Sequence, residues 1–137
     1  MFWTPHMIIG IIVSALLYPI YGLNVLIILI SNILIDADHY LWYIWIIKDK
    51  NLVKAFKFYK NRNIRLTYGR ILHIFHTAEI LSLIIILNFY YKFFFFILIG
   101  IVIHLILDII YEFNNEYCRG LRFWSFLEYL ITKIVTV

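Results

Sequence analysis

All five histidines of the chain lie in or beside long apolar segments, and four carboxylates accompany them there. An ionisable group in an apolar environment is unfavourable by several kcal/mol unless it is paired, hydrated or bound to a metal. Imidazole and carboxylate groups together form the ligand set that Zn²⁺, Mn²⁺ and Fe²⁺ share. The sequence therefore predicts a metal centre built from a subset of nine residues: His6, Asp36, Asp38, His39, His73, His76, Glu79, His104 and Asp108.

The size of this set indicates one or two metal ions, since a single zinc ion needs only four ligands. Two ions about 3.5–4 Å apart are a common hydrolytic device, and a bound water of pKa about 7 then supplies the nucleophile. Zinc is the expected metal, with manganese or iron as alternatives. Glu79 and the spare aspartate Asp38 are the candidate general bases. The expected metal ligands are His6, Asp36, His39, His73, His76, His104 and Asp108. A structural reading stays open, in which His104 and Asp108 form a polar clamp between helices.

The composition predicts an all-α integral membrane protein. Hydrophobic residues make up 64% of the chain and the mean hydropathy is +0.90, whereas soluble proteins are about 45–50% apolar. A transmembrane helix needs about 20 apolar residues. We expect one domain, residues 1–137, with four transmembrane helices at about 6–21, 23–47, 71–91 and 93–113.

The distribution of charge predicts the orientation in a plasma or inner membrane. Eight of the twelve Lys and Arg residues fall within residues 48–70, beside a single acid, Asp49. By the positive-inside rule this basic loop is cytoplasmic, and so are both termini. Residues 121–137 form an amphipathic pattern that predicts an interfacial helix. Anionic lipid headgroups account for the basic residues, so we expect membrane lipids and no nucleic acid as partners.

Under this topology the polar residues converge in one layer. With a rise of about 1.5 Å per residue, those of the last three helices lie about 5–17 Å from the cytoplasmic ends of their spans. Residues three or four apart share a helix face, so helix 2 presents Asp36 and His39, helix 3 presents His73, His76 and Glu79, and helix 4 presents His104 and Asp108. Asp38 does not share the face of Asp36 in a regular helix. It indicates either a second metal or partner, or a local distortion of residues 36–39.

The order of these motifs resembles a known group of membrane proteins. The matching elements are His6, Asp36-Ala37-Asp38-His39, His76-Thr77 and the His104–Asp108 pair, with residues 122–124 as a further Trp-containing element. The pattern is similar to that of the YdjM-like family, inner-membrane-bound metal-dependent hydrolases also described as LexA-binding. The resemblance implies that these residues are metal ligands of a hydrolase, with a His and Asp pattern similar to zinc-dependent phospholipase C and related nucleases. This chain departs from the family in having Ile35 where a proline is usual, and in the spacing of His73 and His76.

We therefore expect a membrane-embedded metal-dependent hydrolase whose site lies in the cytoplasmic half of the bilayer. A lipid-like phosphoester is the expected substrate, because a headgroup can enter a site at this depth sideways; ester and amide bonds remain open. Two other classes stay open: a metal or proton transporter using the same cluster, and a regulatory membrane protein with a structural metal. The protein is also a candidate homo-oligomer.

Overall fold

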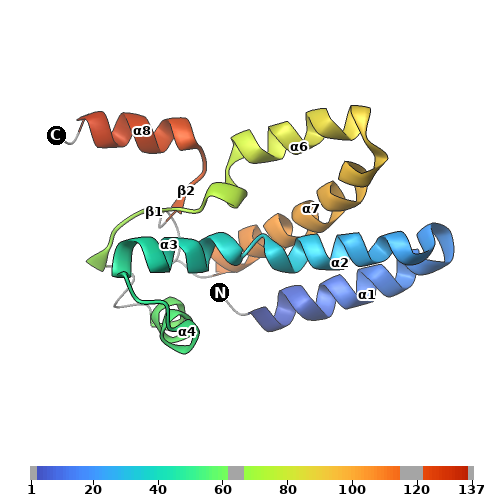
Figure 1. Cartoon of the computed structure of the whole chain (residues 1–137), viewed down its shortest axis with the longest axis horizontal. Coiled ribbons are helices and arrows are strands. Elements are labelled where there is room, and N and C mark those ends of the chain that lie inside the picture. The colour runs from blue at the N-terminus through green and yellow to red at the C-terminus, as the bar shows by residue number, and fades with distance from the viewer. Residues whose placement is uncertain (1–2, 62–66, 115–121, 136–137) are drawn as a thin grey trace.

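The structure, a computed structural model, describes residues 3–61, 67–114 and 122–135. The chain begins with two antiparallel helices, α1 (Trp3–Tyr21) and α2 (Val25–Leu34), which lie side by side (Figure 1). A 3-10 turn, η1 (Gly22–Asn24), joins them. Gly22 has a φ of +57°, a conformation that favours glycine because it has no Cβ. Both helices are rich in Ile and Leu on their outer as well as their inner faces.

Helix α7 (Lys92–Asn114) packs closely against α2. A Cβ atom at Gly100 would lie 2.4 Å from the backbone oxygen of Ile28, so only glycine permits this approach. Small residues at such crossings are typical of helices that pack in an apolar environment. On the other side of α2, the side-chain amide of Asn32 donates a 2.8 Å hydrogen bond to the backbone oxygen of His6. Helices α1 and α7 are thereby held on either side of the end of α2.

The expected continuous helix over 23–47 is wrong, because the chain breaks after α2 and resumes as α3 (Ala37–Ile47). The break consists of Ile35 and Asp36, and the backbone N–H of His39 then donates to the oxygen of Asp36 over 3.1 Å. This distortion turns both Asp36 and Asp38 into the interior, where each is buried. One of the two alternatives for residues 36–39, a local distortion, is therefore confirmed.

The basic loop contains a helix, α4 (Leu52–Lys60), which lies beside the end of α3 (Figure 1). Asn51 caps it, since its side-chain oxygen accepts a 3.0 Å hydrogen bond from the N–H of Lys54. Ala55 and Phe58 bury one face of α4 against Tyr43 of α3. The lysines of α4 point away from this contact, and α4 is thus amphipathic.

The expected third span, 71–91, is helical only in its second part. Residues 71–72 form a short strand, β1 (Ile71–Leu72), and 74–76 form the 3-10 turn η2 (Ile74–His76). Helix α6 (Ala78–Tyr90) begins after Thr77, whose ψ of 153° is extended. The expectation that His73, His76 and Glu79 share one helix face is therefore wrong.

The C-terminal segment returns to the region of β1. Strand β2 (Arg122–Phe123) pairs with β1 in parallel, with Ile71 opposite Arg122. Helix α8 (Phe126–Val135) follows and extends outward from the bundle (Figure 1). The expected helix over 121–137 is thus observed over 126–135, and residues 121, 136 and 137 lie outside the described residues. Glu79 accepts hydrogen bonds from the backbone N–H groups of Phe126 and Leu127 at the start of α8.

Two helical stretches of the described residues are long and apolar enough to cross a membrane, where the sequence predicted four. They are residues 4–47, which contain the α1–α2 reversal, and residues 92–114. Helix α6 is apolar but has only 13 residues, about 20 Å at 1.5 Å per residue, against a hydrocarbon core of about 30 Å.

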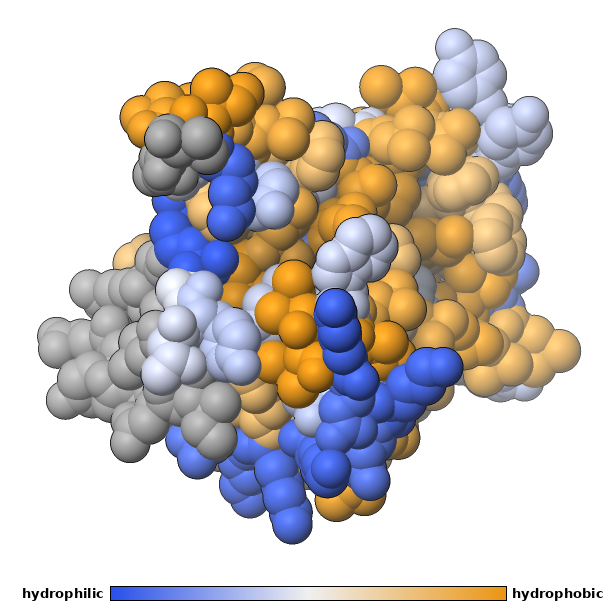
Figure 2. Space-filling view, turned by 60° about the vertical axis from the view of Figure 1, so that its left-hand side comes forward, coloured by the Kyte–Doolittle hydropathy of each residue, from blue (hydrophilic) through white to orange (hydrophobic). Residues whose placement is uncertain are grey.

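The surface divides by polarity. Figure 2 shows hydrophilic side chains gathered along the lower edge of one face and again at its upper left, with hydrophobic side chains over much of its centre and right-hand part. Large apolar side chains elsewhere are exposed, and both Trp45 and Phe89 are 80% exposed. Soluble monomers rarely expose contiguous apolar patches this widely, so this exterior suits an apolar surrounding.

Candidate metal centre

Eight of the nine residues singled out from the sequence form one buried cluster. They come from α1, the α2–α3 junction, residues 73–76 and α7, which come together near the C-terminal end of α2. Each of the eight is at most 8% exposed: His6, Asp36, Asp38, His39, His73, His76, His104 and Asp108. The ninth, Glu79, lies outside the cluster.

The middle of the cluster consists of three ligand atoms that face one another. The Nε2 atoms of His76 and His104 are 3.4 Å apart, and the Oδ1 atom of Asp36 lies 3.6 Å from the first and 3.4 Å from the second. This carboxylate oxygen is buried and has no hydrogen bond within the described part of the chain. A buried carboxylate is unfavourable without a compensating donor or positive charge, and a metal ion is one group that can supply it.

Hydrogen bonds on the far side of each ring set the tautomer. The Nδ1 atom of His104 lies 2.8 Å from the backbone oxygen of Asn32, which can only accept, so Nδ1 carries the proton. The Nδ1 atom of His76 lies 3.1 Å from a carboxylate oxygen of Asp38 and donates to it in the same way. In a neutral imidazole the other nitrogen then has a free lone pair. Both Nε2 lone pairs therefore point into the centre beside Asp36, which is the arrangement of metal-binding histidines.

The separations of these atoms fit tetrahedral coordination. Bonds of about 2.0–2.2 Å from zinc to nitrogen and oxygen place the ligand atoms of a regular tetrahedron about 3.3–3.6 Å apart. The three observed distances, 3.4, 3.6 and 3.4 Å, fall in this range. Asp36, His76 and His104 are thus one group of three that can hold a metal ion.

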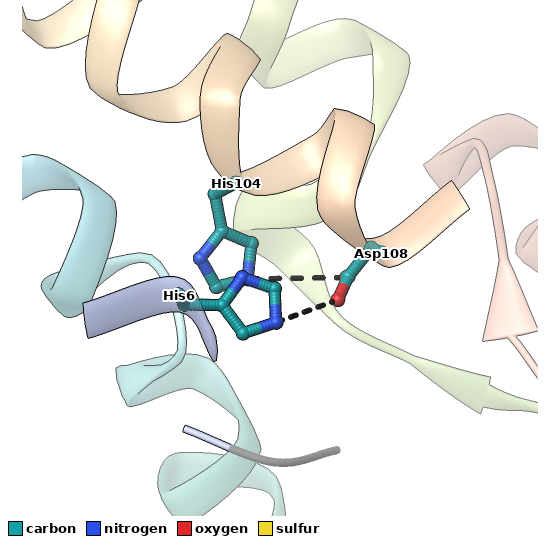
Figure 3. A group of neighbouring side chains, drawn as sticks. All are labelled: His6, His104 and Asp108. Carbon is teal, nitrogen blue, oxygen red and sulfur yellow. Dashed lines mark ion pairs between the residues drawn. The ribbon is translucent and has the colours of Figure 1, made fainter. Parts of the chain in front are cut away.

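A second group lies between α1 and α7. His6 projects from α1, and both His104 and Asp108 project from α7 (Figure 3). The Nε2 atom of His6 is 3.5 Å from Oδ1 of Asp108, and the rings of His6 and His104 stack with their centroids 4.1 Å apart. His104 belongs to both groups, so His6 and Asp108 adjoin the first site directly.

The third group contains Asp38, His39 and His73. The Nδ1 atom of His39 lies 2.8 Å from Asp38 Oδ1 and 3.4 Å from Asp36 Oδ1. His39 and His73 stack with their ring centroids 3.6 Å apart. Because Asp36 Oδ1 is equally far from His39 and His104, it connects this group to the first. Such a shared carboxylate is how two-ion sites are bridged.

Within the part of the chain that the structure describes, His73 is the member of the third group with an unpartnered ring nitrogen. The Nδ1 atom of His73 is buried and has no hydrogen-bond partner among the described residues, which leaves it available to a ligand.

Glu79, a predicted general base, is a helix-capping residue in the structure. Its carboxylate accepts from the hydroxyl of Ser125 and from two backbone N–H groups of α8. The expectation failed because it assumed a helix through residues 71–79, whereas the helix begins only after Thr77.

Arg122 is the residue of the site region that was not identified as a site residue from the sequence. Arg122 is buried, and its Nη1 atom donates a 2.7 Å hydrogen bond to Oδ2 of Asp108. Its Nε atom lies 2.9 Å from Oε1 of Glu112. The pairing of β2 with β1 brings Arg122 to the site, and sequence spacing does not reveal that pairing. The available signal in the sequence was the Trp-containing element at residues 122–124.

Comparison with known proteins adds no relative: no protein-family model, no curated protein and no solved structure matches the chain. The site is therefore defined by its own geometry, as buried groups of histidine and aspartate that can hold a metal ion.

Proposed function

We propose that this protein is a membrane-embedded metal-dependent hydrolase that acts on a lipid-like phosphoester. The observation that carries the proposal is the convergence of two histidine lone pairs and an unpartnered carboxylate oxygen on one buried point, at His76, His104 and Asp36. The motif resemblance to the YdjM-like family supports the same class of protein.

The apolar exterior supports a location in the membrane. Residues 4–47 and 92–114 are apolar over lengths that can cross a bilayer, and the lysines of α4 lie at the end of the molecule where α3 ends. The positive-inside rule places that end at the cytoplasmic side of a plasma or inner membrane.

The ligand set supports hydrolysis. Asp36, His76 and His104 could hold a divalent ion, zinc by the ligand chemistry with manganese or iron as alternatives, which would supply an activated water and polarise a phosphoryl oxygen. The chain's own contribution is orientation: the oxygen of Asn32 and the carboxylate of Asp38 hold the Nδ1 protons of His104 and His76. Asp38, predicted as a base, has both oxygens engaged and serves instead as a positioning residue.

The links between the three groups of possible metal ligands support a second ion beside the first. Asp36 connects the His76 and His104 pair to His39 and His73, and His104 connects it to His6 and Asp108. With two ions, all seven predicted ligands would take part in metal binding, and Asp36, His76 and His104 would hold the first ion. A single ion at that position is the minimal case.

The test is metal content and hydrolysis in detergent-purified protein. We expect at least one transition-metal ion per chain and metal-dependent hydrolysis of an aryl phosphodiester. Asp36→Asn should lose most of both, because an amide has no negative charge. Asp49→Asn is the matched control, since Asp49 is an aspartate that pairs with exposed Lys54 outside the cluster. Full metal binding by Asp36→Asn and His76→Ala, with melting curves showing a folded protein, would refute the proposal.

A further inference from the structure

Arg122 is a buried cation with an unused hydrogen-bonding edge. Its side chain is only 8% exposed, and its Nη2 atom is buried without a hydrogen-bond partner among the described residues. The guanidinium has five N–H donors in a rigid fork. Burying two of them unpaired is unfavourable, so the free edge indicates a ligand that is not part of the chain.

The surroundings of Arg122 fix its position. Asp108 binds Nη1 at 2.7 Å, and Glu112 lies 2.9 Å from Nε. Trp124 stacks against the guanidinium, with Cζ 3.8 Å from the ring. Backbone pairing of β2 with β1 holds the residue opposite Ile71. A side chain held by an ion pair on each side and an aromatic face is preorganised, and Nη2 is the nitrogen left without an ion-pair partner among the described residues.

The guanidinium of Arg122 lies next to the candidate metal centre. Asp108 Oδ2, which accepts from Nη1 of Arg122, is 3.6 Å from His76 Nε2 and 3.9 Å from His104 Nε2. One carboxylate therefore separates the Nη1 end of the guanidinium from the point on which the histidine lone pairs converge.

We propose that Arg122 binds a non-bridging oxygen of a phosphoryl group and places that group at the centre. Arginine is the side chain best matched to phosphate, because its planar fork offers parallel N–H donors and stays charged. The inference rests on the proposed function and names the chemical group that its substrate carries. Two sources carry this group, a phospholipid headgroup and a water-soluble phosphate, and the experiment distinguishes them.

The experiment measures phosphate binding rather than turnover. Inorganic phosphate is titrated calorimetrically into detergent-purified protein that has been loaded with zinc and freed of excess metal, and into metal-free protein. In parallel, phosphatidic acid in maltoside micelles is titrated by its phosphorus NMR shift. We expect Arg122→Gln to weaken binding about 10- to 100-fold, the effect of losing a charged hydrogen bond. Arg122→Lys, which keeps the charge but lacks the fork, should weaken it less.

Lys54→Gln is the matched control. Lys54 is 65% exposed at the side chain and pairs with Asp49, so it is a cation outside the cluster that does not contact Arg122. Its loss should leave both dissociation constants unchanged. If Arg122→Gln loses only phosphatidic acid binding, the ligand of Arg122 is a phospholipid headgroup. If it also loses inorganic phosphate binding, Arg122 accepts soluble phosphate as well.

The proposal is overturned if neither probe binds the wild type, or if both Arg122 variants bind as tightly as the wild type. In that case Arg122 is only the counter-ion of Asp108. Arg122→Gln leaves Asp108 and Glu112 without their cation and can unfold the protein. If its melting curve shows an unfolded protein, the phosphate affinity of Arg122→Lys is the test of the proposal. Zinc content is measured in every sample. If the wild type holds no zinc, the metal-dependent function is contradicted. Phosphate binding by metal-free wild type and metal-free Arg122→Gln still tests the role of Arg122.

Discussion

Asp38 contacts three groups of the centre at once. Its carboxylate lies 2.8 Å from Nδ1 of His39 and 3.1 Å from Nδ1 of His76, and it accepts a 2.8 Å hydrogen bond from the backbone N–H of Phe75. The last two contacts tie the 73–76 segment to α3 and orient the ring of His76. Residues that hold a ligand's second nitrogen set both the tautomer and the basicity of the ligand.

Replacement of Asp38 by Asn should therefore weaken metal binding without abolishing it. An asparagine offers one acceptor oxygen where the carboxylate offers two. Either His39, which faces Oδ1, or His76 together with Phe75, which both face Oδ2, therefore loses its acceptor. We expect zinc affinity to fall about 10- to 100-fold, measured by competition with a chromogenic chelator, while Asp49→Asn retains wild-type affinity. Unchanged affinity would show that Asp38 does not orient His76. A loss as complete as that of Asp36→Asn would make Asp38 a ligand.

At the scale of elements, the segment between β1 and α6 determines which residues reach the centre. It is extended at His73, turns through η2 and starts a helix after Thr77. This path sends His73 and His76 inward and turns Glu79 toward α8. Glu79 then accepts hydrogen bonds from Ser125 and Phe126, and a negative charge at a helix N-terminus is stabilising.

Loss of this cap should loosen α8 and leave the centre intact. Because Ser125 and the N–H of Phe126 donate to it, the pKa of Glu79 is lowered from 4.5 to about 2. A lowered folded-state pKa means that the stabilisation is complete above about pH 4.5 and is lost as the pH falls toward 2. In Glu79→Gln the backbone amides of α8 should exchange with solvent roughly 3- to 10-fold faster at pH 7 than in the wild type, measured by hydrogen-exchange mass spectrometry. The wild type should show the same loosening of α8 in acid.

Asp49→Asn again serves as the control, because it removes one acidic charge far along the sequence from α8. Zinc binding by Glu79→Gln should equal that of the wild type. A loss of zinc together with unchanged exchange in α8 would contradict the capping role and return Glu79 to the centre.

The sequence predicted the long elements well and the short ones poorly. Uninterrupted apolar runs predicted helices at 6–21 and 93–113, and the structure has helices at 3–21 and 92–114. Residues 71–77 were misread because a spacing of three residues between His73 and His76 also suits a helix face. The helix start at Thr77 has a recognisable signal, a threonine followed by an acid in the first turn. No local pattern indicates that β2 pairs with β1, and Arg122 was missed for that reason.

At the scale of the whole molecule, the centre is the point to which several helices and the segment before α6 all contribute residues. His6 brings in α1, Asp36 the α2–α3 junction, His76 the segment before α6, and His104 with Asp108 brings in α7. Much of the exterior is apolar as well as the interior, so in the proposed membrane location burial against water would not by itself specify the arrangement. A cation shared by these residues would supply the missing cohesion, because without one the clustered carboxylates repel each other.

Removal of the metal should therefore destabilise the whole molecule and not only the site. A ligand that binds the folded state at a concentration 1,000-fold above its dissociation constant contributes about 4 kcal/mol, which for a chain of 137 residues corresponds to a rise in Tm of about 10 °C or more. We expect a chelator to lower the Tm of the detergent-purified protein by this amount and added zinc to restore it. Asp36→Asn should already melt at the lower temperature and should not respond to the chelator, while Asp49→Asn should behave as the wild type does. If the chelator strips the metal and the wild-type Tm stays constant, the cluster is held together by its hydrogen bonds and the Arg122 ion pair alone, and the metal serves chemistry without supporting the fold.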